Sequence, residues 1–98
     1  MERDEGKRLA RAFIDLIQSS GDTDSYYFDF IEELLREGEH GVAVDSLALH
    51  AVDNGLAVPD ALVDRYKRYC NEYRDADEEL EEFLTEQKKL KAERASAK

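Results

Sequence analysis

The chain has 98 residues, of which 42% are hydrophobic and 39% are charged, and its formal net charge is −10. This length suits a single domain, residues 1–98, with a modest core. The charge disfavours nucleic-acid backbones and anionic membranes as partners, whereas it favours a basic partner or high solubility.

Cysteine usage and hydropathy indicate the cellular compartment in which the protein is expected. The only cysteine, Cys70, excludes an intramolecular disulfide and a four-thiolate zinc site. The charged N-terminus lacks the apolar run of a signal peptide, and no stretch approaches the roughly 18 apolar residues of a membrane span. We therefore expect a cytoplasmic protein that does not insert into a membrane.

The first predicted helix ends at Gly21, because glycine tolerates the left-handed conformation of a helix C-terminal cap. Its apolar residues have the spacing of a one-sided helix: Leu9, Ala12, Phe13, Leu16 and Ile17. A second helix begins near Asp22, Asp24 and Ser25, whose side-chain oxygens can cap exposed backbone N–H groups, and it ends at Gly38. Its predicted buried face consists of Tyr27, Phe30, Ile31, Leu34 and Leu35, and its outer face consists of Asp29, Glu32, Glu33 and Arg36.

The third predicted helix runs from about residue 39 to 54 and ends at Gly55. One of its faces combines apolar side chains with carboxylates, at Val42, Asp45, Leu49 and Asp53. This face is either a contact patch for a partner or the edge of a wide, mostly buried helix.

The fourth predicted helix begins at Pro59, which suits a first helical turn, and no breaker follows it. Its apolar seam alternates spacings of four and three residues through Leu62, Tyr66, Tyr69, Tyr73, Ala76, Leu80, Phe83, Gln87 and Leu90. A continuous helix to Leu90 would be about 48 Å long, well beyond the ~13 Å radius of gyration of such a domain. We therefore expect it to project and form a homodimer through Leu62–Leu90, or to fold back or fray beyond Ala76. The tail, residues 92–98, is expected to be frayed.

Together these elements predict an all-α fold, a small four-helix domain with a long C-terminal helix. The expected core consists of Phe13, Leu16, Ile17, Phe30, Ile31, Leu34, Leu47, Ala51, Leu62 and Tyr66.

Motifs for catalysis or metal binding are not found in the sequence. His40 and His50 lack the spacing that places two ligands on one helical face, and no phosphate-binding loop or nucleophile motif occurs. Carboxylates on an outer helix face lack the pocket that would shift their pKa values for catalysis. We expect no enzyme, no metal site and no cofactor. The alternating bases and tyrosines at residues 65–69 could stack on nucleic acid, but the tyrosines belong to the heptad seam.

One short pattern resembles a known family. Residues 34–39, Leu-Leu-Arg-Glu-Gly-Glu, are followed by Val42-Ala43 and, after a helix, by Val58-Pro59. This pattern, between Phe30 and Tyr66, resembles the MafI-type immunity proteins, small helical antidotes encoded beside bacterial polymorphic toxins. The resemblance implies that the chain binds a cognate toxin and blocks it.

The charge distribution is compatible with that role. Residues 21–60 contain ten acidic residues and one basic residue, Arg36, and so carry nearly all of the net charge. Many such toxins are nucleases with basic clefts, and complementary charge speeds association. We predict that the toxin binds to Asp29, Glu32, Glu33, Asp45, Leu49 and Asp53. The alternative function is a helical adaptor or oligomerisation subunit that pairs through the C-terminal heptad helix.

Overall fold

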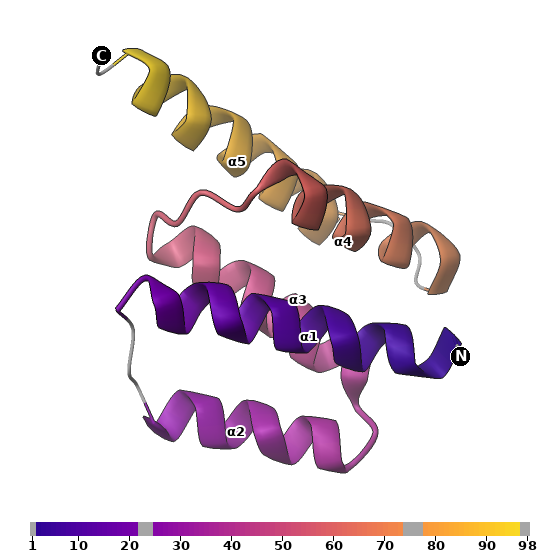
Figure 1. Cartoon of the computed structure of the whole chain (residues 1–98). Coiled ribbons are helices and arrows are strands. Elements are labelled where there is room, and N and C mark those ends of the chain that lie inside the picture. The colour runs from indigo at the N-terminus through magenta and orange to yellow at the C-terminus, as the bar shows by residue number, and fades with distance from the viewer. Residues whose placement is uncertain (1, 22–24, 74–77, 97–98) are drawn as a thin grey trace. The chain divides into compact units, whose positions relative to one another are not determined.

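The computed structural model describes residues 2–21, 25–73 and 78–96. All regular structure within these ranges is helical, so the all-α prediction is confirmed (Figure 1). The helices are α1 (Glu2–Ser19), α2 (Ser25–Arg36), α3 (His40–Asp53), α4 (Asp60–Tyr73) and α5 (Glu78–Ser96). The predicted breaks at Gly21, Gly38 and Gly55 are also confirmed, whereas the predicted capping residues Asp22 and Asp24 lie outside the described ranges.

Backbone geometry explains why α2 ends where it does. Gly38 has a φ of 80°, in the left-handed region that side chains with a Cβ atom rarely adopt. Its N–H donates to the carbonyl of Leu35 over 3.2 Å, and the N–H of Glu39 donates to the carbonyl of Leu34 over 2.9 Å. This pair of bonds is the Schellman motif, which satisfies carbonyls that the helix end leaves open. The same pair closes α3 at Gly55, whose φ is 64°.

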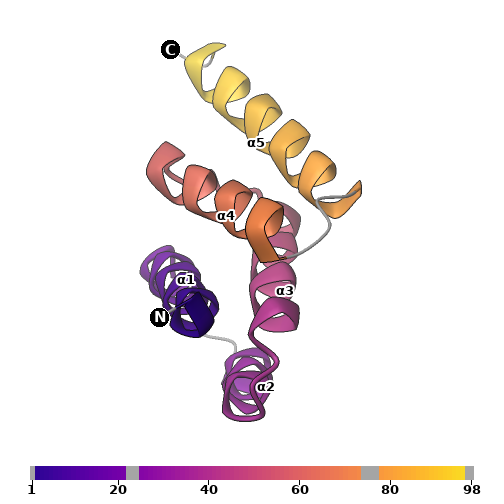
Figure 2. The ribbon, with the colours of Figure 1, turned by 90° about the vertical axis from the view of Figure 1, so that its right-hand side faces the viewer.

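The chain divides into two compact units, residues 1–48 and 49–98, with the boundary inside α3. In the first unit, α1 and α2 run antiparallel (Figures 1 and 2). Arg11 on α1 forms an ion pair with Glu32 on α2, and the hydroxyl groups of Tyr27 on α2 and Ser46 on α3 lie 3.0 Å apart. Cooperative folding of both units as a single domain stays a prediction.

Most of the predicted core is confirmed. Seven of the ten residues are buried: Phe13, Ile17, Ile31, Leu47, Ala51, Leu62 and Tyr66. Leu16 and Leu34 are half-buried at the edges of their stripes. Because the buried residues follow the predicted periodicity, hydrophobic burial accounts for most of the helix orientations.

The prediction that Phe30 is buried is wrong, because its side chain is 52% exposed. The buried stripe of α2 consists of Phe28, Ile31 and Leu35 instead. A helix turns by about 100° per residue, so Phe30 lies roughly 160° from Phe28 around the axis. Only one of these two rings can therefore face the core, and the T-shaped contact of Phe28 with Tyr27 accompanies its burial.

The continuous helix predicted from Pro59 to Leu90 is also wrong. The Nζ atom of Lys91 lies 2.5 Å from Oδ1 of Asp60, although the two residues are 31 positions apart. On one straight helix that separation would be about 47 Å. The chain therefore folds back, as the alternative expectation had it, and α5 lies beside α4 in the second unit (Figures 1 and 2).

Most of the heptad seam in the described residues is buried in this folded-back arrangement. The rings of Tyr66 and Phe83 meet edge to face with their centroids 5.0 Å apart. Leu62, Tyr69, Leu80 and Gln87 are buried as well, whereas residues 74–77, which include Ala76 of the seam, lie outside the described ranges. The homodimer predicted through Leu62–Leu90 thus loses the exposed seam that motivated it. Helix α5 also includes residues 92–96, which had been assigned to a frayed tail.

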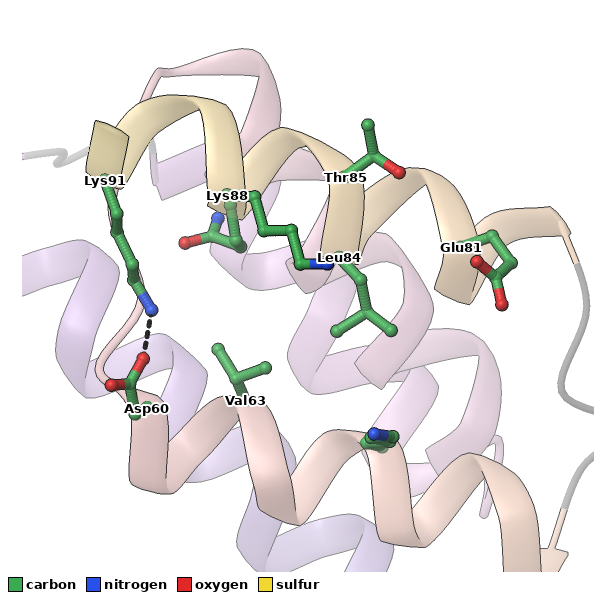
Figure 3. A pocket seen from close by; sticks show the side chains of 9 residues that line it. Asp60, Val63, Glu81, Leu84, Thr85, Lys88 and Lys91 are labelled. Carbon is green, nitrogen blue, oxygen red and sulfur yellow. Dashed lines mark hydrogen bonds and ion pairs between the residues drawn. The ribbon is translucent and has the colours of Figure 1, made fainter. Parts of the chain in front are cut away.

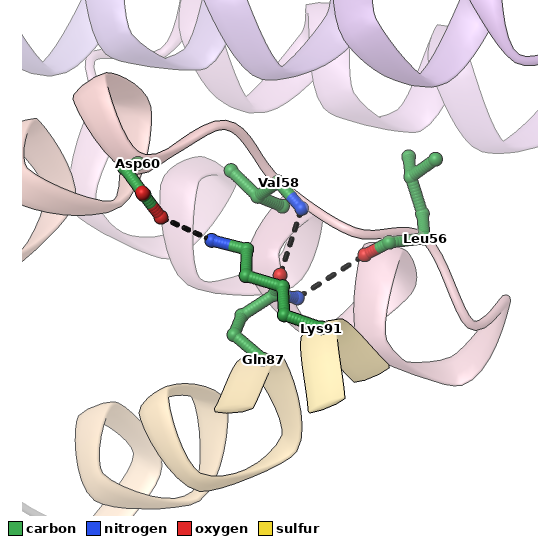
Figure 4. Close-up of polar contacts among 5 residues, drawn as sticks. All are labelled: Leu56, Val58, Asp60, Gln87 and Lys91. Atoms are coloured by element: carbon green, nitrogen blue, oxygen red, sulfur yellow. Dashed lines mark hydrogen bonds and ion pairs between the residues drawn. The ribbon is translucent and has the colours of Figure 1, made fainter. Parts of the chain in front are cut away.

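The buried amide of Gln87 attaches α5 to the segment between α3 and α4 (Figure 4). Its Oε1 accepts a hydrogen bond of 2.7 Å from the N–H of Val58, and its Nε2 donates one of 3.1 Å to the carbonyl of Leu56. Buried backbone polar groups cost free energy when they are left without a partner. Gln87 satisfies one donor and one acceptor at once, which fixes the position of α5 along α4.

The register of α2 can be tested with two alanine substitutions on the same helix. Ile31→Ala should cost about 2–5 kcal/mol of unfolding free energy, because it leaves a cavity in the core. Phe30→Ala should cost less than ~0.5 kcal/mol, because its ring is largely exposed. Urea denaturation followed by circular dichroism measures both. Equal losses would contradict the assignment of the two faces.

The Gln87 attachment predicts a different pair of effects. Gln87→Leu should destabilise the protein by about 1–3 kcal/mol, because the polar groups of Leu56 and Val58 lose their partners. Gln18→Leu is the matched control, because Gln18 is exposed on α1, and it should change stability by ~0.5 kcal/mol or less. A loss for Gln87→Leu no larger than the control would mean that the attachment does not stabilise the fold.

Candidate binding surface on the second helix

The six residues predicted to bind a partner do not form one surface within a unit. Asp29, Glu32 and Glu33 lie on α2 and Asp45 lies on the first part of α3, all in the first unit. Leu49 and Asp53 belong to the second unit. Asp29, Glu33, Leu49 and Asp53 are exposed, whereas Glu32 and Asp45 are half-buried.

Glu32 is engaged by a base on the neighbouring helix. Both nitrogens of the Arg11 guanidinium reach its carboxylate, with Nη1–Oε2 and Nη2–Oε1 distances of 2.5 Å and 2.9 Å. The two hydrogen bonds lower the pKa of Glu32 and raise that of Arg11. Such a two-pronged contact fixes the geometry of both side chains. The anion of Glu32 is thus neutralised within the protein, and its place in the fold is to join α1 to α2.

Two exposed aromatic rings on α2 were missed by the sequence prediction. Tyr26 is 89% exposed and Phe30 is 52% exposed. They are four residues apart, so they occupy the same side of the helix about one turn apart. A helical-wheel count shows why they are exposed. Tyr26 lies about 160° around the helix from Phe28, on the side opposite the buried stripe, and Phe30 lies within about 40° of Tyr26.

Two carboxylates lie beside these rings. Tyr26, Asp29, Phe30 and Glu33 lie within an arc of about 100° and form what we call the α2 outer face. Glu33 forms an ion pair of 3.2 Å with Arg36, but both side chains are more than half exposed. Ion pairs this exposed contribute little, so a partner can displace Arg36 at small cost.

This combination suits a cationic partner. Carboxylates accept bidentate hydrogen bonds from arginine, and an aromatic ring attracts a cation over its face. Tyrosine is also enriched among the residues that dominate binding energy at protein interfaces. The α2 outer face can therefore supply both charge and apolar contact area to a basic protein surface.

The outer face of α3 is exposed in the way the contact-patch interpretation requires. Val42 is 46% exposed and Leu49 is 38% exposed. They are seven residues apart and so lie on one side of the helix. Between them, Ser46 contacts the hydroxyl of Tyr27. The exposure of this face is thus confirmed, and its binding of a partner stays a prediction.

Comparisons with protein-family models, curated proteins and solved structures found no match. Across the described residues, no group of three or more His, Cys, Asp and Glu side chains is placed to hold a metal ion. None of the helices in the described part of the chain combines the length and apolar character needed to cross a bilayer.

The Arg11–Glu32 pair predicts a specific pH dependence. Because the hydrogen bonds lower the pKa of Glu32 below its ordinary value of 4.5, the pair stabilises the folded state above about that pH. This contribution is lost as the pH falls through the lowered pKa. Glu32→Gln should therefore cost about 0.2–1 kcal/mol at pH 7 and nothing at a pH below that lowered value.

The measurement is urea denaturation of Glu32→Gln, of Glu33→Gln and of the unchanged protein at pH 7 and at a pH below the lowered pKa of Glu32. Glu33→Gln is the control, because its partner Arg36 lies on the same helix and both are exposed. A cost of Glu32→Gln that does not depend on pH would show that the carboxylate charge is not what joins α1 to α2.

Proposed function

We propose that this protein binds a basic protein partner through the α2 outer face and that the partner is a toxin, which it neutralises as an immunity protein. The observation that carries this proposal is the exposure of Tyr26 and Phe30 one turn apart beside the carboxylates of Asp29 and Glu33. It is a binding function and not a catalytic one. The partner residues that it requires are arginine and lysine side chains around an apolar contact.

The exposed rings contribute little to the stability of the free protein, because most of their surface stays in water. Burial against a partner would gain about 25 cal/mol for each Å² of apolar surface removed from water. Aromatic anchors of this kind commonly cost more than about 1 kcal/mol of binding when truncated. Phe30 is therefore the expected principal anchor.

Charge has a separate part in the proposed complex. The net charge of −10 would attract a basic toxin over a distance and raise the association rate. In a toxin whose cleft binds nucleic-acid phosphates, the carboxylates of this protein would occupy the phosphate positions. Inhibition would follow because the bound antidote covers the cleft.

The resemblance to MafI-type immunity proteins supports a toxin as the partner. The alternative adaptor function depended on a free heptad seam. Since Tyr66 and Phe83 contact each other within the chain, no observation favours that alternative.

The proposal is tested by co-expression with the toxin encoded by the neighbouring gene and by binding kinetics at two salt concentrations. Phe30→Ala should raise the dissociation rate about tenfold while leaving the protein folded. Glu33→Lys should slow association and weaken its salt dependence. Tyr27→Phe is the control for the aromatic change, and Glu93→Lys, an exposed reversal on α5, is the control for charge.

Two outcomes would contradict the proposal. If Glu93→Lys slows association as much as Glu33→Lys, only the net charge matters and the α2 outer face is not the contact. If Phe30→Ala binds with unchanged dissociation, the anchor lies elsewhere, and Leu49→Ala becomes the next variant to measure.

A further inference from the structure

A groove of about 330 Å³ lies between α4 and α5 in the second unit (Figure 3). Val63 on α4 and Leu84 on α5 point toward one another across it. The Asp60–Lys91 ion pair closes one end. Its volume falls at the lower end of the range of small-molecule pockets, so it suits a ligand of about one ring.

The antiparallel register places a lysine opposite each apolar residue of the groove. Because Asp60 lies against Lys91, the position three residues along α4 faces the position three residues back along α5. By this count Val63 lies at the level of Lys88 along the helix pair, and Lys67 lies at the level of Leu84, while all four residues line the groove. At one level of the groove the apolar residue is on α4 and the lysine on α5, and at the next level the apolar residue is on α5 and the lysine on α4.

The charge of the groove is opposite to that of the chain. Three lysines and two carboxylates line it, and one of those carboxylates, Asp60, is already paired with Lys91. Among the described residues, Lys67 and Lys88 have no ion-pair partner. The remaining carboxylate, Glu81, leaves an excess of one positive charge in a protein of net charge −10.

We propose that this groove binds a small organic anion, a carboxylate carried on a single-ring apolar body. The ring lies between Val63 and Leu84, and the carboxylate receives hydrogen bonds from the ammonium groups of Lys67 and Lys88. Apolar contact alone would not discriminate a carboxylate from a neutral amide of the same shape. Charge-assisted hydrogen bonds supply that discrimination. This binding is independent of the α2 outer face and of its partner.

The test uses the full chain and three probes: benzoate, its neutral counterpart benzamide, and acetate, which carries the charge without the ring. Amide NMR spectra follow the titrations. Benzoate should shift the amide signals of Val63 and Leu84 in a saturable way and bind about tenfold more tightly than benzamide. Acetate should give no saturable shift at the same concentrations.

Paired variants separate the groove from general charge. Lys67→Gln with Lys88→Gln should weaken benzoate about tenfold and remove its advantage over benzamide. Lys7→Gln with Lys89→Gln changes the net charge equally at exposed positions that do not line the groove, and it should weaken benzoate no more than about twofold. Unaltered amide spectra outside the groove show that the variants are folded.

Three results would overturn the proposal. One is equal affinity for benzoate and benzamide, which would show that the lysines do not contact the ligand. Another is an equal loss in both variant pairs, which would show that only net charge is sensed. The third is the absence of saturable shifts at Val63 and Leu84 at millimolar benzoate.

Discussion

The helices of this protein are short, between 12 and 19 residues, and each depends on burying one apolar stripe against a neighbour. Isolated helices of this length are marginal in water, because nucleation is costly and each added residue gains little. The Schellman caps at Gly38 and Gly55 end helices, but they do not hold them together. Burial of the apolar stripes does that. The Arg11–Glu32 ion pair adds a contact between helices in the first unit, and Tyr66, Phe83 and Gln87 add contacts in the second.

The sequence allowed the elements to be predicted better than their pairing. Helix ends at glycine are local, since a positive φ depends on the absence of a Cβ atom and on little else. The path of the C-terminal half is not local. A heptad seam buries equally well against another chain or, after a reversal, against itself, so Leu62 to Leu90 could not decide between projection and folding back. The decisive partners are distant in sequence, as the Gln87 hydrogen bonds to Leu56 and Val58 demonstrate.

The candidate surface was only partly predictable for a related reason. Helix α2 has seven apolar or aromatic residues, and its buried stripe accommodates about half of them. Which of them are buried depends on the side chains of the helix that packs against α2. Phe28 faces inward, so Phe30 faces outward and joins Tyr26. The carboxylates of α2 could be recognised in the sequence. That Arg11 on α1 neutralises Glu32 could not be predicted, because it depends on how α1 packs against α2. The exposed aromatic rings thus lie beside carboxylates because the core buries Phe28 and leaves Phe30 outside.

Fluorine NMR of the protein labelled with 4-fluorophenylalanine tests the account most directly. The chain has four phenylalanines, of which Phe13, Phe28 and Phe83 are buried and only Phe30 is exposed. A soluble paramagnetic agent should broaden one resonance of the four, and that resonance should be absent in Phe30→Leu. Addition of the basic toxin should protect the same resonance from broadening. Four equally protected resonances in the free protein, or a toxin complex in which the Phe30 resonance stays open to the agent, would contradict the account.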